Sequence, residues 1–224
     1  MSEKKIKIIK DGPYIVYGAI PLKEMIITKV EGHYELVEGD KLPQNKTYTL
    51  CRCGKSKNHP FCDFSHKEEN FDGKETADRR PYRDRIQEKI EGEKVTLLDD
   101  GRCAFARFCH RETGDAWSLA QNCSDDEQVS EAIKAACECP SGRLVILDKE
   151  LNEIEYEYEQ RVEIFQDPEK NVSGPIVVKG FIPIESSDNF QYEKRNRVAL
   201  CRCGHSQNKP FCDAMHVPKK FKDK

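Results

Sequence analysis

The feature that most constrains this 224-residue chain is a duplicated segment rich in cysteine. Residues 51–66 and 201–216 are near copies that share the run Cys-Arg-Cys-Gly, a serine, the run Pro-Phe-Cys-Asp and a final histidine. The similarity extends upstream, where Gly-Pro leads into short β-branched runs at residues 12–22 and 174–184. Each copy is therefore predicted to form a β-rich arm followed by a loop of metal-binding side chains.

The cysteine count and the charge distribution exclude several classes of protein. The chain has 11 cysteines, an odd number, and residues 1–10 lack the apolar segment of a secretory signal, so a secreted disulfide scaffold is disfavoured. No apolar run approaches the roughly 20 residues that cross a bilayer. The net charge is -3 without a long basic block, which argues against binding to nucleic-acid phosphates. We expect a cytoplasmic protein whose cysteines bind metal, with no membrane and no nucleic-acid partner.

The first copy supplies four candidate metal ligands in two pairs. Cys51 and Cys53 lie two apart, so an extended strand would point both toward one metal ion. Cys62 and His66 lie four apart, so a helix would bring both to a second ion. Two ligands on each of two irons is the arrangement that a [2Fe-2S] cluster requires. The second copy repeats the set with Cys201, Cys203, Cys212 and His216.

The alternative is a structural zinc ion held by three cysteines and one histidine. Zinc sites usually place at least two residues between their first two cysteines, whereas a single residue separates Cys51 from Cys53. The spacing favours iron–sulfur over zinc, and a zinc-stabilised interaction module stays open as the alternative.

The pattern Cys-x-Cys-x2-Ser-x3-Pro-x-Cys-Asp-x2-His resembles the CDGSH iron–sulfur domain, the module of the NEET family. Both copies match it at every ligand, and they depart from it where Phe64 and Ala214 replace the glycine of the family's name. We expect these positions to lie in the first turn of a helix capped by Asp63, where a side chain is harmless. The resemblance implies two [2Fe-2S] clusters and an intertwined pair of modules, here within one chain as a monomeric, internal pseudo-dimer.

The stretch between the copies carries a different set of cysteines. Cys103, Cys109 and Cys139, the last before a proline, resemble the ligands of a divergent mono-cluster ferredoxin domain, with Ala106 where a further cysteine would stand. Three cysteines suit a [3Fe-4S] cluster, and a fourth ligand from Cys123, Cys137 or His110 would permit [4Fe-4S]. The open alternatives are that this domain holds no cluster and that Cys123 and Cys137 are buried apolar residues.

The predicted fold class is α+β, with two small β-rich CDGSH modules at residues 1–80 and 161–224 and an inserted ferredoxin-like α+β domain at residues 81–160. Residues 67–93 are strongly charged and are predicted to form a linker. Residues 125–137 are predicted to form a helix that begins at a capping box of Ser124 and Glu127 and ends before Pro140.

The sequence shows no nucleophile–base pair and no substrate site, so we do not predict an enzyme. The leading hypothesis is an iron–sulfur protein that acts in electron transfer or redox sensing, with a redox partner protein. The second hypothesis is storage of iron–sulfur clusters or their delivery to apo-acceptor proteins.

Overall fold

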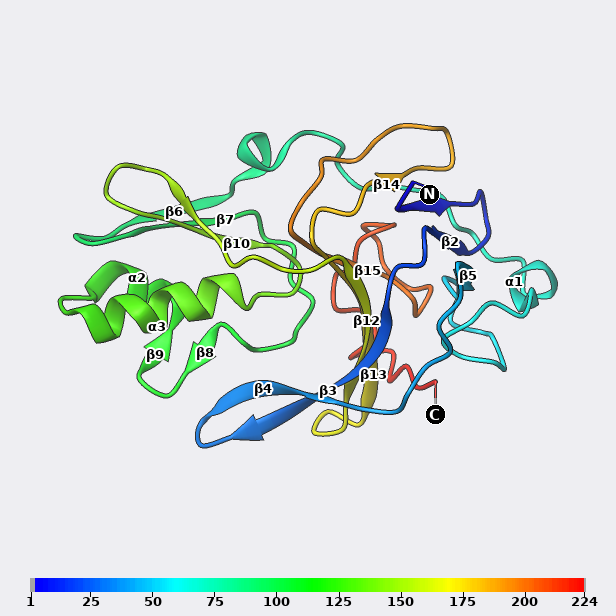
Figure 1. Cartoon of the computed structure of the whole chain (residues 1–224), viewed down its shortest axis with the longest axis horizontal. Coiled ribbons are helices and arrows are strands. Elements are labelled where there is room, and N and C mark those ends of the chain that lie inside the picture. The colour runs from blue at the N-terminus through cyan, green and yellow to red at the C-terminus, as the bar shows by residue number, and fades with distance from the viewer. Residues whose placement is uncertain (1–2, 224) are drawn as a thin grey trace.

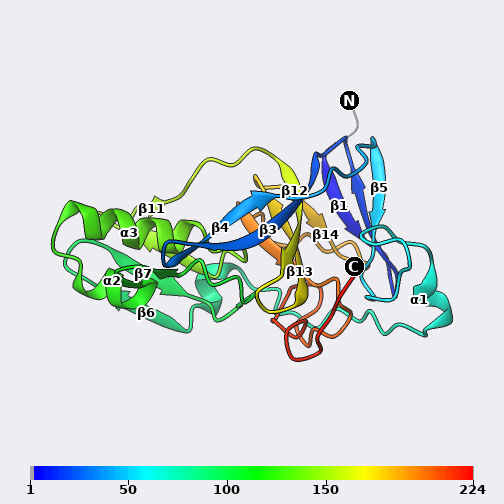
Figure 2. The same ribbon diagram turned by 90° about the horizontal axis from the view of Figure 1, so that it is seen from below.

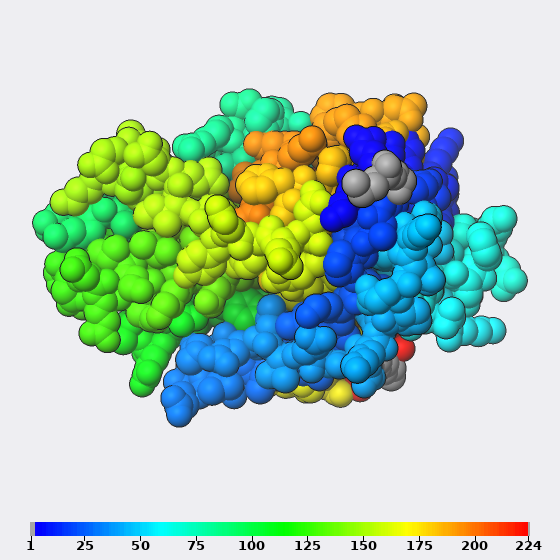
Figure 3. All heavy atoms as spheres, viewed as in Figure 1, coloured from blue at the N-terminus to red at the C-terminus, as the bar shows by residue number. Residues whose placement is uncertain are grey.

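Strands dominate the chain and form separate sheets, with only a few short helices (Figure 1). The computed structural model describes residues 3–223. Two sheets with the cysteine-rich loops lie at one end, and an α+β domain forms a lobe at the other end (Figure 3). This arrangement is consistent with two β-rich modules and an inserted domain. Among the residues described, no helix has the length and apolar character needed to cross a bilayer.

The first sheet combines strands from both halves of the chain. Its order is β14-β1-β2-β5, with β1 (Lys5–Ile8), β2 (Tyr14–Tyr17), β5 (Thr47–Leu50) and β14 (Ile184–Glu185). In β1 the alternation of lysine and isoleucine buries Ile6 and Ile8 on one face, as expected for a strand with one face toward the core.

The second sheet has the order β15-β13-β12-β3-β4. Its strands are β3 (Leu22–Val30), β4 (His33–Glu38), β12 (Arg161–Asp167), β13 (Val172–Lys179) and β15 (Arg197–Leu200). Strands β3 and β4 form a hairpin that turns at Gly32, whose φ of +91° suits glycine. The hairpin extends toward the inserted domain (Figure 3).

The two sheets exchange strands, since the β3–β4 hairpin of the first copy joins the second sheet and β14 of the second copy joins the first. After Pro21 the chain leaves the first sheet, and β3 pairs in parallel with β12 of the second, where the Val162 N–H donates to the Pro21 carbonyl at 2.9 Å. After Pro183 the reverse happens, since β14 pairs in parallel with β1, and the Ile6 N–H donates to the Pro183 carbonyl at 2.9 Å. Figure 2 shows both pairings. Neither sheet is complete without a strand from the other copy.

One hydrophobic core joins the two copies. Ile6 and Val16 from the first copy pack in the same buried cluster as Ile164 and Val178 from the second. The Tyr14 hydroxyl, fully buried, donates across the boundary to the Cys201 carbonyl at 2.8 Å. The copies therefore share their apolar interior, which is the main stabilising term for a small β-rich module.

The inserted domain packs two helices on an antiparallel sheet. The sheet order is β11-β10-β7-β6, with β6 (Glu88–Glu91), β7 (Thr96–Asp99), β10 (Leu144–Leu147) and β11 (Glu153–Ile154). The helices are α2 (Ala116–Asn122) and α3 (Asp126–Cys137), and the short strands β8 (His110–Arg111) and β9 (Gly114–Asp115) precede them. The apolar face of α3 covers the sheet with Ala132, Ala135 and Ala136.

Two local predictions need correction. Helix α3 forms as predicted, but its cap is Asp125, whose carboxylate accepts the Gln128 N–H at 2.9 Å, so the capping box at Ser124 was wrong. The charged linker is not devoid of structure, because α1 (Ser65–Glu68), the 3-10 turn η1 (Tyr82–Arg85) and β6 lie at or within it. It is anchored by Tyr82, a buried side chain whose hydroxyl donates to the Leu98 carbonyl.

Candidate metal centres

In each copy a short strand delivers the first two cysteines. Strand β5 ends at Leu50 and β15 ends at Leu200, immediately before the first cysteine of each loop. The sulfurs of Cys51 and Cys53 lie 3.6 Å apart, and those of Cys201 and Cys203 lie 3.7 Å apart, all four residues buried. These pairs meet as the sequence predicted.

The third cysteine and the histidine form the other pair. Nδ1 of His66 lies 3.5 Å from the Cys62 sulfur, and Nδ1 of His216 lies 3.5 Å from the Cys212 sulfur. The predicted pairs are therefore present in both copies.

The backbone conformation that brings each third cysteine next to its histidine differs from the prediction. Helix α1 begins only at Ser65, after Cys62, and residues 214–220 form turns without a helix. Phe64 and Ala214 have φ values of +72° and +67°, in the left-handed region that favours glycine. The expectation that these positions lie in a helical turn was wrong, and the glycine of the motif has a conformational reason.

The left-handed residue turns its backbone N–H toward the sulfur two residues earlier. The N–H of Phe64 donates to the Cys62 sulfur at 3.4 Å, and that of Ala214 to the Cys212 sulfur at 3.4 Å. Burial raises the pKa of the Cys62 and Cys212 thiols, and these hydrogen bonds act against it. An N–H donor at sulfur stabilises a thiolate and adjusts the reduction potential of an iron–sulfur centre.

The spacing of each pair fits two ligands on one tetrahedral ion. At a metal–sulfur distance of about 2.3 Å and a metal–nitrogen distance of about 2.0 Å, two sulfurs lie about 3.8 Å apart and a sulfur and a nitrogen about 3.5 Å apart. The observed distances of 3.6 Å for Cys51–Cys53 and 3.5 Å for Cys62–His66 agree with these values. Among residues 3–223, no three His, Cys, Asp or Glu side chains converge on one metal ion. Each site therefore offers two pairs of donors, and each pair has the spacing of two ligands on one ion.

The two sulfurs of each close pair share a hydrogen bond, which separates their pKa values. A hydrogen bond from Cys53 lowers the pKa of the Cys51 thiol to about 5, while the same contact raises that of Cys53. In the second copy the hydrogen bond from Cys203 lowers the pKa of Cys201 to about 7. One sulfur of each pair is thus readily available as a thiolate, the form that binds metal.

The serine and the aspartate of each motif hold the loop rather than the metal. Ser56 Oγ donates to the Phe61 carbonyl at 2.6 Å and accepts the Asn58 N–H at 3.0 Å. Asp63 accepts the Lys57 N–H at 2.8 Å, a contact that lowers the pKa of its carboxyl. The second copy repeats these bonds at Ser206 and Asp213.

Two residues of the motif escaped the sequence analysis, the arginine and the glycine of Cys-Arg-Cys-Gly. Arg52 and Arg202 are each 1% exposed, and their Nε atoms donate to the carbonyls of Gly12 and Gly174, which ties each loop to its arm. Arg202 also pairs with Asp223. Their occurrence at the same place in both copies was the available signal.

The glycines allow the two loops to touch. Cys53 and Cys203 form an antiparallel bridge between the copies. A Cβ on Gly54 would lie 2.4 Å from the Cys203 carbonyl oxygen, and a Cβ on Gly204 would lie 2.3 Å from that of Cys53. Side chains are excluded from both positions, so the two loops approach each other through their backbones.

The three cysteines predicted in the inserted domain line one small cavity. Cys103, Cys109 and Cys139 share its wall with Trp117, and burial raises the pKa of Cys109 to about 12. The loop between the first two contains Phe105 at a φ of +58°, and the Phe105 N–H donates to the Cys103 sulfur at 3.3 Å. The same arrangement, in which a residue with a positive φ donates its N–H to the sulfur two residues earlier, occurs at Cys62 and Cys212.

The candidates for a fourth ligand do not reach this cavity. Cys123 and Cys137 lie in the apolar core of the inserted domain, where the Cys137 thiol donates to the Ile154 carbonyl at 3.4 Å. His110 is exposed on β8. None of the three lines the cavity, so its donor set consists of three thiols.

The paired ligands and the exchanged strands define a metal-binding protein with a duplicated centre. Residues 11–67 and 173–217 match the family model described as iron-binding zinc finger CDGSH type, and residues 90–149 match the one described as divergent 4Fe-4S mono-cluster. The chain is therefore a tandem CDGSH-type iron–sulfur protein, whose two CDGSH segments flank a divergent mono-cluster domain.

One curated relative shows how far the similarity extends. The mouse (Mus musculus) CDGSH iron-sulfur domain-containing protein 3, mitochondrial, is 48% identical over 46 residues, which are 20% of this chain and 29% of the relative. The chain thus covers less than a third of that protein's length. No solved structure matches the chain.

Proposed function

We propose that each CDGSH segment holds one [2Fe-2S] cluster through three cysteines and one histidine, and that the protein acts in electron transfer or redox sensing. The observation that carries the proposal is that both copies contain the same two ligand pairs. In one pair two sulfurs lie 3.6 or 3.7 Å apart, and in the other a sulfur lies 3.5 Å from an imidazole nitrogen. The ligands are Cys51, Cys53, Cys62 and His66 in the first site and Cys201, Cys203, Cys212 and His216 in the second.

A bound [2Fe-2S] cluster would supply one-electron chemistry. Clusters held by four thiolates have potentials of about -400 mV, and those with two histidines reach about +300 mV, so one histidine predicts an intermediate value. The protein supplies the N–H donors at Cys62 and Cys212 and the buried environment that adjust this value further.

We infer that the two modules form a pseudo-dimer within one chain. The reciprocal pairing of β3 with β12 and of β14 with β1 supports this, as does the core shared by the copies. A second copy of the chain is then not needed to complete either site, and the protein is monomeric. The domain boundaries at residues 80 and 160 stay predictions, with each matched segment lying inside its predicted range.

For the inserted domain we propose a [3Fe-4S] cluster on Cys103, Cys109 and Cys139. The three thiols that line one cavity support it. A [4Fe-4S] cluster would need a fourth ligand from outside this cavity wall.

The test is spectroelectrochemical reduction of the purified protein, followed by reoxidation. Electron transfer or sensing predicts full recovery of the visible spectrum over repeated cycles, with unchanged iron content. We do not propose an enzyme, and the partner is expected to be a redox protein. If the clusters instead move quantitatively to an apo-ferredoxin and do not survive reduction, storage or delivery is the function.

A further inference from the structure

We propose that the two CDGSH sites are not equivalent, because the inserted domain closes the second site while the first site stays open to exchange its cluster. The inference rests on the proposed function, in which both sites hold a cluster.

The two sites differ most in the exposure of their Cys–His pairs, which are called the outer ligands below. The inner cysteines Cys51 and Cys201 are each 1% exposed. Of the outer ligands, Cys212 is 3% exposed whereas Cys62 is partly exposed, and His216 is 3% exposed against 8% for His66. The ligands and the hydrogen bonds of the serine and the aspartate repeat in both loops. What lies against each loop differs.

The cover over the second site is the run Arg102–Ala104 of the inserted domain. Ala104 packs against Cys212 in a small buried cluster. The guanidinium of Arg102 lies 4.6 Å from the centre of the Phe211 ring, beside that cysteine. Residues of the inserted domain thus cover Cys212. The equivalent cysteine of the first site, Cys62, is instead partly exposed to solvent.

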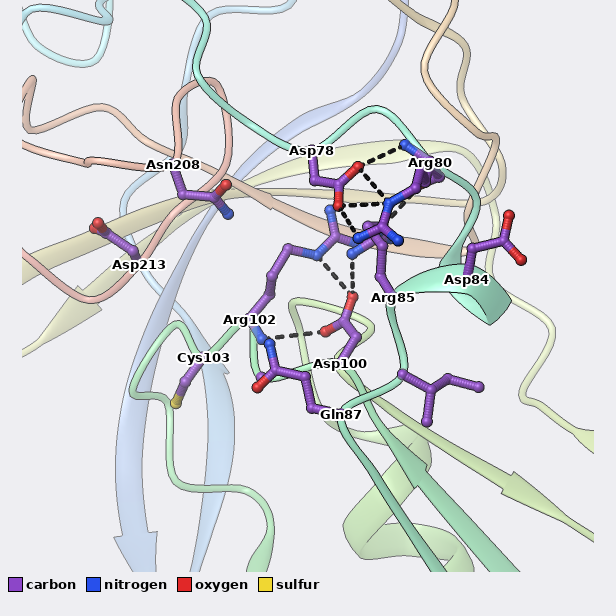
Figure 4. Close-up of a pocket in the computed structure, with 12 residues that line it drawn as sticks. Asp78, Arg80, Asp84, Arg85, Gln87, Asp100, Arg102, Cys103, Asn208 and Asp213 are labelled. Atoms are coloured by element: carbon purple, nitrogen blue, oxygen red, sulfur yellow. Dashed lines mark hydrogen bonds and ion pairs between the residues drawn. The ribbon is translucent and has the colours of Figure 1, made fainter.

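This cover is held at both ends. Asp100, whose side chain is fully buried, accepts from Arg102 Nε at 2.8 Å and from Arg85 at 2.6 Å (Figure 4). Beyond Ala104, Arg107 makes two bonds to Asp167 of β12, at 2.7 and 2.9 Å. Opening the cover requires breaking buried ion pairs, so it is a rare local event.

A charged cavity of about 640 Å³ approaches the second site without reaching its ligands. Its wall includes Arg102, Cys103 and Asp213 (Figure 4), but neither Cys212 nor His216. A small molecule in this cavity therefore meets the cover and not the outer ligand pair.

The first site has no such cover from the inserted domain. Figures 1 and 2 both place α1, which carries His66, at the opposite end of the molecule from α2 and α3. Phe64, next to Cys62, is 61% exposed, and its ring lies 6.0 Å from that of His66. Cys62 itself is partly exposed, so the first site is accessible from solution at this ligand.

Cluster loss to a chelator needs no electron transfer when the cluster is oxidised. Each ferric iron leaves as its chelate, each sulfide leaves as hydrogen sulfide after taking protons from water, and the protein sulfurs are protonated. Access to the outer ligand pair is then the step that the cover controls.

The experiment follows the [2Fe-2S] clusters of the whole protein during incubation with a small iron chelator at pH 7. Samples are reduced at intervals and quantified by the EPR signal of the reduced [2Fe-2S] form. We expect two phases of equal amplitude whose rates differ by about tenfold or more. The single variant His66→Cys should change the fast phase only, and His216→Cys the slow phase only.

Two variants open the cover and one is a matched control. Arg102→Ala and Arg107→Ala should each accelerate the slow phase by about tenfold and leave the fast phase unchanged. Arg80→Ala changes a residue of the same cavity that pairs with Asp78, and it should change neither phase. Circular dichroism establishes that each variant is folded.

Three outcomes would overturn the inference: a single phase for both clusters, an equal acceleration of both phases by Arg102→Ala, or a slow phase that responds to His66→Cys. These outcomes leave the proposed function intact. A protein that lacks iron and sulfide when purified would instead refute the proposed function before any rate is measured.

Discussion

The backbone N–H of Phe64 lies 3.4 Å from the sulfur of Cys62, and a φ of +72° at Phe64 is what directs it there. Ala214 and Cys212 repeat the relationship. A left-handed conformation costs a non-glycine residue about 1–2 kcal/mol. At both sites this strain accompanies the placement of a backbone donor on a ligand sulfur.

Glycine at this position should therefore be tolerated or favourable. We predict that Ala214→Gly raises the free energy of unfolding of the loaded protein by up to about 1 kcal/mol, because relief of the left-handed strain exceeds the added chain entropy. Ala214→Val should lower it, since a β-branched residue fits a positive φ poorly. Denaturant unfolding measures both changes, and a stabilising valine would contradict the explanation.

The contact between the two loops gives a second prediction. Gly54→Ala should destabilise the protein by about 3 kcal/mol or more, because the new methyl group would overlap the Cys203 carbonyl oxygen. Gly32→Ala is the matched control, since Gly32 has a φ of +91° but its nearest neighbouring atom is 3.5 Å from the Cβ position. The control should cost only about 1–2 kcal/mol. Equal losses in the two variants would mean that strain alone, and not the approach of the loops, explains the glycine.

The ion pair below the second loop gives a third prediction. The side chains of Asp223 and Arg202 are 2% and 1% exposed, so Asp223→Asn should cost about 3 kcal/mol by leaving a buried guanidinium without its counter-charge. Asp188→Asn is the control, because Asp188 pairs with Arg79 at the surface and should change stability by less than about 1 kcal/mol.

The pH dependence of that loss follows from the carboxyl group. Burial would raise the pKa of Asp223, but Arg202 outweighs it, with help from Ser173, and lowers it to about 2. A lowered carboxyl pKa contributes stability above the unfolded value of 3.8 and loses it as the pH falls toward 2. The effect of Asp223→Asn should thus be the same at pH 6 and pH 8, and a loss that grows between these values would refute the assignment.

The histidine ligands should make the clusters sensitive to acid. Protonation of an imidazole competes with its binding to iron. At His216, burial opposes protonation and lowers the pKa to about 4, with a smaller contribution from Arg202. The double variant His66→Cys and His216→Cys should therefore slow cluster loss at pH 6, as followed by visible absorbance, more strongly toward pH 4.5 and less at pH 8. Identical decay of variant and parent at pH 6 would show that neither histidine is the weak ligand.

The ligand pairs were predictable because the same spacing of cysteines and histidine occurs twice in the sequence. Cys51 and Cys53 two apart, and Cys62 and His66 four apart, were enough to predict which residues meet. The conformation that joins the second pair was not predictable, since Phe64 and Ala214 carry no propensity for a positive φ and tertiary contacts override their preference.

The strand exchange and the cover over the second site were also beyond the sequence. Periodicity predicts that residues 22–30 form a strand but does not specify β12 as its partner. The contact of Ala104 with Cys212 joins two parts of the chain that share no pattern, and it distinguishes two sites whose local sequences are nearly the same.

Quantification of iron and acid-labile sulfide per chain, with EPR of the reduced protein, tests the central claim most directly. Two occupied CDGSH sites require four irons and four sulfides, and a filled inserted domain adds three or four irons. The account predicts a reduced [2Fe-2S] signal with nitrogen coupling from the histidines. One zinc ion per CDGSH site, without sulfide, would contradict it.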